Sequence, residues 1–167
     1  MNRNLLPDLL AENLYAVPLD ALWQRGVRCL VLDLDNTLMP WNAREYDEKL
    51  PAWLENARQM GFALFMLSNG TGPRVQEMAG RLGLGCIANA CKPRASGFET
   101  AARRAGVPCE RCAAIGDQIF TDILGANRAG FYSILVEPLS SREFLFTKFT
   151  RLVERPIRRR VRNRVKV

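Results

Sequence analysis

The sequence predicts an α/β fold, in which helices cover both faces of a parallel β-sheet. Short apolar segments alternate along the chain with longer amphipathic ones, and Pro or Gly stands at many of the boundaries. Four successive apolar segments are also followed by polar side chains that can carry chemistry. At 167 residues and 48% hydrophobic composition, the chain is expected to bury one core of its own.

The expected strands are near-continuous apolar runs, which is typical of strands that are buried on both faces. They span residues 29–33, 62–67, 84–90, 112–116 and 132–136. The expected helices lie between them, at residues 51–60, 73–82, 98–105 and 122–130. Pro51 and Pro73 suit the first position of a helix, and Gly61, Gly83 and Gly130 suit its end.

Polar side chains follow the first four of these strands. They are Asp33 and Asp35, Ser68 and Asn69, Lys92, and Asp117 with Asp122. Ligands bind at the carboxyl ends of the strands in open α/β sheets, so these side chains are expected to form one site.

Considered alone, each of these residues also has a purely structural explanation, as part of a turn, as a helix cap or as a solvated lysine. The residues with such an explanation are Asp33 and Asp35 with Asn36 and Thr37, the turn Ser68–Asn69–Gly70, Lys92, and Thr121 with Asp122. Their joint occurrence at four strand ends favours a functional site.

Carboxylates held close together repel one another unless a cation lies among them. Oxygen ligands select a hard ion such as Mg²⁺, which also takes a substrate phosphate. Lys92 adds a positive charge and Ser68 a hydrogen-bond donor, so the set suits a dianion. A carboxylate beside a bound phosphate can act as a nucleophile and form an aspartyl-phosphate.

Four motifs that contain these residues resemble the haloacid dehalogenase (HAD) phosphatases. They are DLDNT at 33–37, LSNG at 67–70, KP at 92–93 and GDQIFTD at 116–122, in the order usual for that family. The resemblance covers roughly residues 27–136. It implies a Rossmann-like fold of three layers and an enzyme that hydrolyses phosphomonoesters.

The resemblance also implies a role for each site residue. Asp33 is expected to be the nucleophile, and Asp35 the acid that protonates the leaving oxygen and later activates water. Ser68 and Lys92 are expected to bind the transferring phosphoryl group, and Asn69 is expected to bind the substrate with them.

The implied cofactor is Mg²⁺. Its expected ligands are Asp33, the backbone carbonyl of Asp35, and Asp117, while Asp122 is expected to support its own loop.

Many HAD enzymes carry a cap domain after the first or second motif. Here 32 residues separate Asp35 from Ser68 and 23 separate Ser68 from Lys92, and a loop, a helix and a strand fill each interval. The site is therefore expected to have no cap domain, which suits a phosphate presented on something large or a partner subunit that closes the site.

Longer stretches are similar to the YqeG-type branch of HAD subfamily IIIA. They include DLDNTLMPW, GDQIFTDILGANRAG, YSILVEPL and LLPDLL. That branch is related to phosphatases that convert phosphatidylglycerophosphate to phosphatidylglycerol, which implies a lipid phosphate substrate. Two alternatives remain open: a phosphatase of a soluble phosphomonoester, and a non-catalytic basic module that binds phosphate or RNA. The pair Asp33 and Asp35 disfavours the second, because binding phosphate requires no nucleophile.

The basic charge is concentrated in residues 142–167, which we separate as a C-terminal tail from a phosphatase domain at 1–141. The net charge is +7, but ten Lys or Arg and two Glu give this tail +8. Apolar residues recur in it every three or four positions, and Pro156 is expected to kink it. It could pack on the domain, bind nucleic acid, or lie on an anionic membrane.

Neither a secretory signal nor an apolar run near the roughly 20 residues of a membrane span is recognisable in the sequence. We therefore expect a cytoplasmic protein that can contact a membrane peripherally. The cysteines are expected to be thiols, with a zinc site as the alternative. That site would need Cys86, Cys91, Cys109 and Cys112, but the first two are spaced C-x4-C and there is no His.

Overall fold

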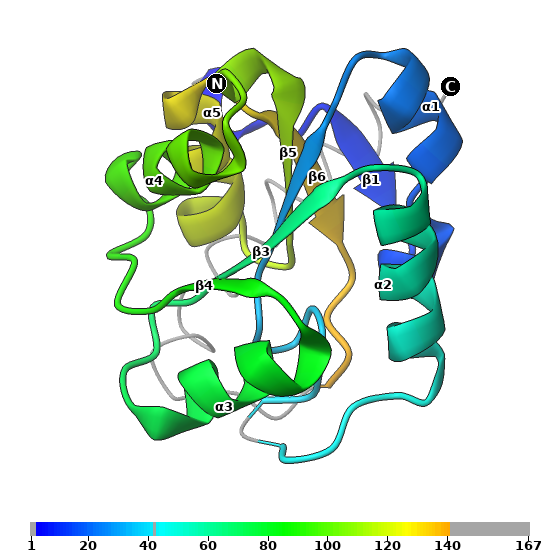
Figure 1. Cartoon of the computed structure of the whole chain (residues 1–167). Helices are drawn as coiled ribbons and strands as arrows, with labels where there is room; N and C mark the ends of the chain where they lie inside the picture. Colours follow the sequence, from blue (N-terminus) through cyan, green and yellow to red (C-terminus); the bar gives the residue numbers. More distant parts are fainter. Residues whose placement is uncertain (1–2, 42, 141–167) are drawn as a thin grey trace.

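The computed structural model describes residues 3–41 and 43–140, and the predicted tail lies outside them. In the described residues, six parallel strands form one sheet in the order β1-β6-β5-β2-β3-β4 (Figure 1). The strands are β1 (Leu9–Ala11), β2 (Cys29–Leu32), β3 (Ala63–Leu67), β4 (Gly85–Ile87), β5 (Cys112–Gly116) and β6 (Tyr132–Val136). The predicted fold class is therefore confirmed.

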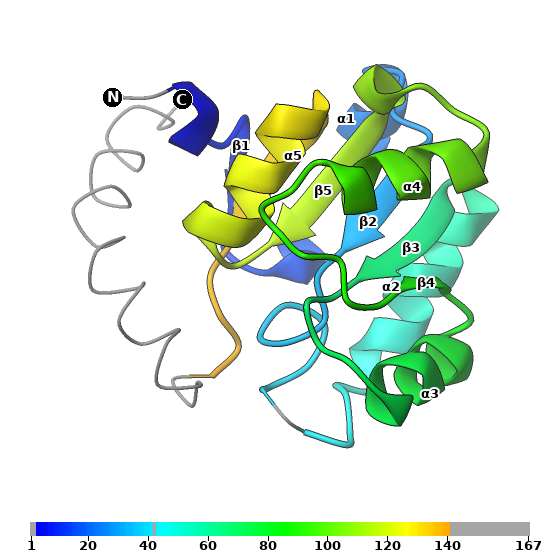
Figure 2. The ribbon, with the colours of Figure 1, turned by 90° about the vertical axis from the view of Figure 1, so that its left-hand side faces the viewer.

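Helices cover both faces of the sheet (Figures 1 and 2). They are α1 (Leu19–Gln24), α2 (Lys49–Gln59), α3 (Pro73–Leu82), α4 (Ser96–Ala105) and α5 (Leu124–Ala129). Alternate residues of β2 serve the two faces, because successive strand side chains point in opposite directions. Leu30 and Leu32 pack in the core that includes residues of α1, α2 and α3, and Cys29 and Val31 in the core that includes residues of α4 and α5.

One edge strand was not predicted. β1 has only three residues and follows Pro7, so it lacks the length that marks a strand in sequence. Its position depends on a contact 125 residues away, since the backbone N–H of Ser133 donates to Asp8 Oδ2 at 2.8 Å. The six-residue helix α1 was also missed; its Trp23 packs edge-on against Phe62, with ring centroids 5.2 Å apart.

Some predicted boundaries differ from the structure. Helix α2 begins two residues before Pro51, which still occupies the first turn, where a backbone N–H has no intrahelical partner. β4 is shorter than the predicted 84–90. The predicted helix 122–130 is α5 preceded by one π-helical turn, Ile119–Ile123. Short 3-10 turns complete the elements, at Arg3–Leu5, Leu14–Ala16 and Cys109–Arg111.

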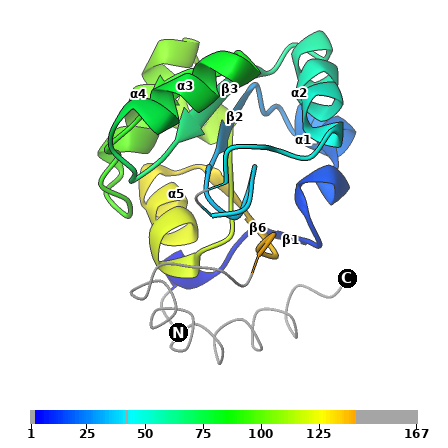
Figure 3. The same cartoon turned by 90° about the horizontal axis from the view of Figure 1, so that it is seen from below.

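The loops that follow β2 and β3 lie at one end of the molecule, which faces the viewer in Figure 3. This is the carboxyl end of the parallel strands, where the site was predicted. Within the described residues, the interval between β2 and α2 contains a loop and no inserted cap domain. None of the described helices is long and apolar enough to cross a bilayer.

Candidate active site

A cavity of about 430 Å³ opens at the carboxyl ends of the strands. Its lining includes five of the residues that the sequence predicted for the site, namely Asp33, Asp35, Ser68, Asn69 and Lys92. Gly70, Pro93, Gln118 and Thr121 add to the walls, and Trp41 and Phe120 supply aromatic surface. The structure thus brings together strand ends that are far apart in sequence.

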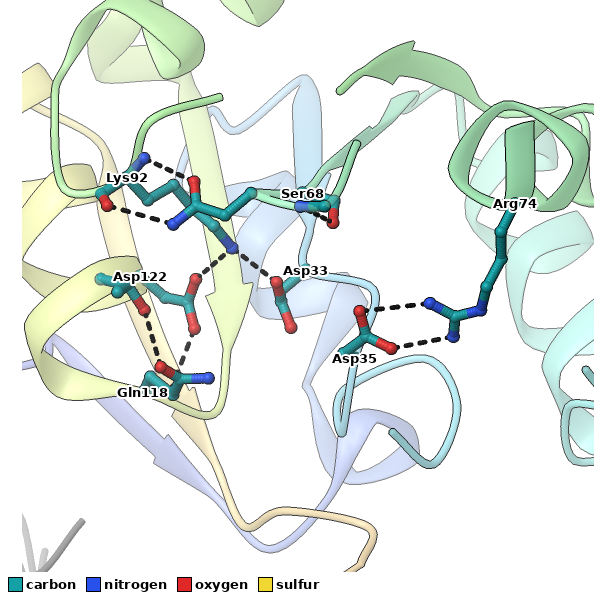
Figure 4. A network of polar contacts seen from close by, with 10 residues as sticks. Asp33, Asp35, Ser68, Arg74, Lys92, Gln118 and Asp122 are labelled. Atoms are coloured by element: carbon teal, nitrogen blue, oxygen red, sulfur yellow. Dashed lines mark hydrogen bonds and ion pairs between the residues drawn. The ribbon is translucent and has the colours of Figure 1, made fainter. Parts of the chain in front are cut away.

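Lys92 lies between two carboxylates at the base of the site (Figure 4). Its Nζ donates to Asp33 Oδ1 at 2.5 Å and to Asp122 Oδ1 at 2.6 Å. Its side chain is only 4% exposed, and such burial by itself would lower its pKa. The carboxylates of Asp122 and Asp33 more than offset this effect, so the pKa of Lys92 is raised and the ammonium stays charged.

The carboxyl of Asp33, directly after β2, is strongly perturbed by its surroundings. Burial raises its pKa well above the ordinary value, although Lys92 acts in the opposite direction, and the nearby charges of Asp122 and Asp117 raise it further. Its second oxygen, Oδ2, is buried without a hydrogen-bond partner. A carboxylate in this setting is poorly compensated until a further cation arrives.

Three carboxylates can converge on one ion. Asp33, Asp117 and Asp122 each offer an oxygen, and these atoms lie within 4.8 Å of one another. With the ammonium of Lys92 among them, the ionised group carries a net charge of −2. An oxygen-only set with this charge fits a hard divalent cation such as Mg²⁺.

The group of carboxylates differs from the predicted ligand set in one residue, Asp122. The side chain of Asp35 points toward Arg74 (Figure 4), and only its backbone carbonyl was expected to bind the ion. Asp122 supports its loop, as expected, because Asp122 Oδ2 accepts from the Gln118 N–H at 3.0 Å. It also belongs to the carboxylate group, a role that was not predicted for it.

A glycine makes room for Asp122. A Cβ on Gly116, the last residue of β5, would lie 2.3 Å from Asp122 Cγ, which is far inside contact distance. The π-helical turn that follows β5 places the Asp122 carboxylate back over the strand end. Turns of this kind are often found at functional sites.

Ser68 and Asn69 follow β3, but they act differently. Ser68 Oγ accepts from the Gly70 N–H at 3.0 Å, so its own O–H can still donate into the cavity. Asn69 forms two hydrogen bonds with the backbone of Lys92. Its Oδ1 accepts from the Lys92 N–H at 2.6 Å, and its Nδ2 donates to the Lys92 carbonyl at 3.1 Å. This support of Lys92 was missed by the sequence analysis.

Arg74, the second residue of α3, was not predicted as a site residue. Its guanidinium lies against Asp35, with Nη2 at 2.8 Å from Oδ1. One sequence signal could have found it, because the first turn of a helix disfavours a positive charge. An Arg in that position suggests a carboxylate partner elsewhere in the fold.

The zinc alternative finds no support in the described residues. Among the described residues, Cys86, Cys91, Cys109 and Cys112 do not come close enough together to hold a metal ion, whereas the three aspartates do. All five cysteines are free thiols. Cys29 and Cys112 face each other across β2 and β5 in the buried core, and their thiol–thiol hydrogen bond raises the pKa of Cys29.

Comparisons with known proteins define the class. A family model described as a haloacid dehalogenase-like hydrolase matches residues 42–130. A protein of Bacillus subtilis named "Probable phosphatase YqeG" is 37% identical over 152 residues, which cover 91% of this chain and 88% of the relative. The chain belongs to the haloacid dehalogenase-like hydrolases. The predicted activity class, a HAD-type phosphatase, is confirmed, and so is the similarity to the YqeG branch.

Two weaker relatives are phosphatidylglycerophosphate phosphatases. The one from Arabidopsis thaliana is 26% identical over 83% of this chain, and the one from Chlamydomonas reinhardtii is 30% identical over 81%. The chain spans about half the length of these two relatives, with 42% and 54% of them covered.

Solved structures show the same fold. A cobalt-bound deoxy-D-mannose-octulosonate 8-phosphate phosphatase from Haemophilus influenzae matches with a TM-score of 0.55 at 15% identity, over 67% of this chain and 69% of its own. The corresponding phosphatase from Moraxella catarrhalis, in complex with magnesium and phosphate ions, matches with a TM-score of 0.52 at 19% identity, over 68% and 72%. At these identities the likeness concerns the fold alone.

Proposed function

We propose that this protein is a Mg²⁺-dependent phosphomonoesterase that works through an aspartyl-phosphate on Asp33. The observation that carries the proposal is the placement of Asp33, which is buried at the cavity base, beside the ammonium of Lys92 and close to two further carboxylates. A carboxylate in such a place can attack the phosphorus of a bound phosphate ester, and Asp35 can protonate the oxygen that leaves.

Asp33, Asp117 and the backbone carbonyl of Asp35 would hold Mg²⁺. The cation, when bound, would offset the negative charge of the transferring phosphoryl group. Asp122 adds to the negative charge of the site and keeps Lys92 in position through the ion pair at 2.6 Å.

The remaining site residues would act on the phosphoryl group or on one another. Lys92 would contact a phosphoryl oxygen, because its ammonium already lies beside the nucleophile. The Ser68 hydroxyl would donate a second hydrogen bond. Asn69, predicted to bind substrate, is better placed to fix the backbone of Lys92 and hence the direction of its side chain.

For the substrate, we propose phosphatidylglycerophosphate. Support comes from the similarity to two phosphatidylglycerophosphate phosphatases and from an open site without a cap domain in the described residues. The lining also contains Trp41, which is 39% exposed. Trp is favoured at a membrane interface, where one end of its ring contacts apolar groups and the other end contacts water.

Trp41 is held by the loop that follows the nucleophile. The backbone turns at Asn36, whose φ of 66° is in the left-handed region. Asn36 Oδ1 accepts from the Trp41 N–H at 3.2 Å, and the Asn36 carbonyl accepts from the N–H of Leu139 at 3.0 Å. The side chain of Leu139 is 41% exposed. Asn36, which follows Asp35 in the chain, therefore bonds the backbones of two residues with exposed apolar side chains, Trp41 and Leu139.

A soluble phosphomonoester is the second candidate substrate. The cavity of about 430 Å³ would hold a small phosphate ester. A glyceraldehyde 3-phosphate phosphatase of Methanopyrus kandleri is also 31% identical over 102 residues, which cover 56% of this chain and 43% of that relative.

A substrate panel tests the proposal. It compares phosphate release, with Mg²⁺ or with a chelator, from phosphatidylglycerophosphate in mixed micelles, soluble phosphomonoesters and 3′-phosphorylated nucleic acid. We expect Mg²⁺-dependent release, fastest from the lipid phosphate, and a Trp41→Ala variant that loses more activity on the lipid than on 4-nitrophenyl phosphate. Faster turnover of a soluble alkyl phosphate than of the lipid phosphate would contradict the lipid assignment, and phosphate release from none of the substrates would contradict the phosphatase.

A further inference from the structure

The side chains of Asp35 and Arg74 form a forked ion pair (Figure 4). Nη2 of Arg74 lies 2.8 Å from Oδ1 of Asp35, and Nη1 lies 3.4 Å from Oδ2. Contacts to both oxygens fix the plane of a carboxylate as well as its location. The two side chains are 25% and 30% exposed, so the pair is partly shielded from water.

The same guanidinium also contacts the loop between Asp35 and α2. Nη2 and Nε of Arg74 lie 3.3 and 3.4 Å from the carbonyl oxygen of Ala43. The backbone of Arg74 is held in place by its helix, because Val75, Met78 and Ala79 of α3 are buried against the sheet. One side chain thus joins α3, the loop and Asp35.

The position of Arg74 is not explained by its own helix. It is the second residue of α3, where the N–H groups and the helix dipole disfavour a cation. The carboxylate of Asp35 and the carbonyl of Ala43 supply the negative partners there.

We propose that Arg74 is a positioning residue for Asp35. The inference rests on the proposed function, in which Asp35 protonates the leaving oxygen. Asp35 lines the cavity, whereas Arg74 is not among the described residues that line it. Arg74 therefore acts through Asp35. Each carboxylate oxygen has further lone pairs, so Asp35 can be held by Arg74 and still face the substrate.

The two chemical steps depend on this placement differently. In the first, an Asp33 oxygen bonds to phosphorus, the bond from phosphorus to the ester oxygen breaks, and the proton of the Asp35 carboxyl goes to that oxygen. In the second, a water oxygen bonds to phosphorus, its proton returns to Asp35, and the bond from Asp33 to phosphorus breaks. A 4-nitrophenolate leaves without a proton, but an alkoxide does not.

Loss of Arg74 should therefore act on the two kinds of ester unequally. Because kcat/KM reports the first step, Arg74→Ala should lower it for an alkyl phosphate at least about tenfold more than for 4-nitrophenyl phosphate. The slower second step should appear as a burst of nitrophenolate before the steady state. Arg74→Lys, which keeps the charge without the fork, should restore only part of the loss.

Arg81 provides the matched control. It lies two turns further along the same face of α3 and holds the same loop, with Nη1 at 2.9 Å from the Arg44 carbonyl and Nη2 at 3.4 Å from Glu45. Neither of these two contacts involves Asp35. Arg81→Ala should leave the ratio of the two kcat/KM values within about twofold of the wild-type ratio, since exposed ion pairs contribute little.

The test compares wild type, Arg74→Ala, Arg74→Lys, Arg81→Ala, Asp35→Asn and Asp35→Asn/Arg74→Ala. The alkyl phosphate is phosphatidylglycerophosphate or glycerol 3-phosphate, whichever the wild type hydrolyses faster. If Arg74 acts through Asp35, the double variant should match Asp35→Asn within about twofold. Equal losses on both esters in Arg74→Ala, a further loss in the double variant, or the same pattern in Arg81→Ala would overturn the inference. Wild-type protein that hydrolyses neither ester would instead overturn the proposed function, and this inference with it.

Discussion

The ammonium of Lys92 lies 2.5 Å from the carboxylate of Asp33, although the two residues are 59 positions apart in the sequence. The pair joins the end of β2 to the loop after β4, and both side chains are almost fully buried. It also places a positive charge where a phosphoryl group would approach the nucleophile.

Lys92→Met should be severe for both stability and activity. The variant keeps the length of the side chain but leaves Asp33 and Asp122 without their shared cation. Removing one partner from a buried ion pair typically costs about 3–5 kcal/mol. Urea unfolding in the presence of a chelator should show a loss of this size, and phosphate release should fall to background.

The double variant Lys92→Met/Asp33→Asn separates charge from packing. It should recover part of the lost free energy of unfolding, because one unpaired carboxylate has been removed, but no activity. A double variant no more stable than Lys92→Met would show that the ammonium contributes through packing alone.

Asp33→Asn should stabilise the metal-free protein at neutral pH, because Lys92 keeps Asp122 as its ion-pair partner and only a buried carboxyl is lost. Burial raises the pKa of Asp33, so the folded state holds its proton more tightly than the unfolded state, whose pKa is about 3.9. The contribution of Asp33 to the free energy of unfolding therefore decreases as the pH rises above about 4, and the loss is complete above the raised pKa.

Urea unfolding between pH 4 and 8 in chelator measures this difference. The free energy of unfolding of Asp33→Asn minus that of wild type should grow with pH. Adding Mg²⁺ should raise the melting temperature of wild type more than that of the variant. A difference that is constant with pH would show that Asp33 has the same pKa in the folded and unfolded states.

Gly116→Ala should displace Asp122, since the new Cβ would lie 2.3 Å from its Cγ. We expect a loss of about 1–3 kcal/mol from overpacking, together with weaker Mg²⁺ binding by calorimetry. Gly80→Ala is the control, because nothing lies within 4 Å of its Cβ and it is inside α3. That change should stabilise the protein by about 0.5–1 kcal/mol and leave Mg²⁺ binding unchanged. Unchanged Mg²⁺ binding in Gly116→Ala would show that Asp122 need not be held in this position.

Much of the fold could be predicted because its signals are local. The apolar run that becomes β2 and the Pro73 and Gly83 boundaries of α3 are written in adjacent residues. β1 could not be predicted in this way, because its strand is three residues long and its partner β6 lies about 125 positions away.

The site shows the same division. Asp33, Ser68 and Lys92 could be predicted because each follows an apolar segment, and parallel strands bring their carboxyl ends to one edge. The contact of the Asn69 side chain with the Lys92 backbone could not, because the two residues are 23 positions apart. Arg74 in the first turn of a helix suggests a carboxylate partner, but nothing in the sequence says that this partner is Asp35, 39 positions away. Side-chain direction, which decides both, is not carried by the hydrophobic pattern.

The basic tail at 142–167 lies outside the described residues, and its role remains a prediction. If it lies on an anionic membrane, each basic residue near the surface contributes about 1 kcal/mol. Deleting residues 157–167 should then reduce sedimentation with anionic vesicles and activity on micellar lipid phosphate, but leave turnover of 4-nitrophenyl phosphate nearly unchanged. Equal loss on both substrates would show that the tail serves the fold, and undiminished vesicle binding would show that it is not the anchor.

The identity of the phosphorylated residue tests the central claim most directly. The protein is mixed with 4-nitrophenyl phosphate and Mg²⁺, quenched in acid during turnover, digested, and mapped by mass spectrometry. We predict one phosphoryl group on Asp33 in wild type, and neither phosphoryl group nor turnover in Asp33→Asn. A phosphoryl group on another residue, or turnover retained by Asp33→Asn, would contradict the account.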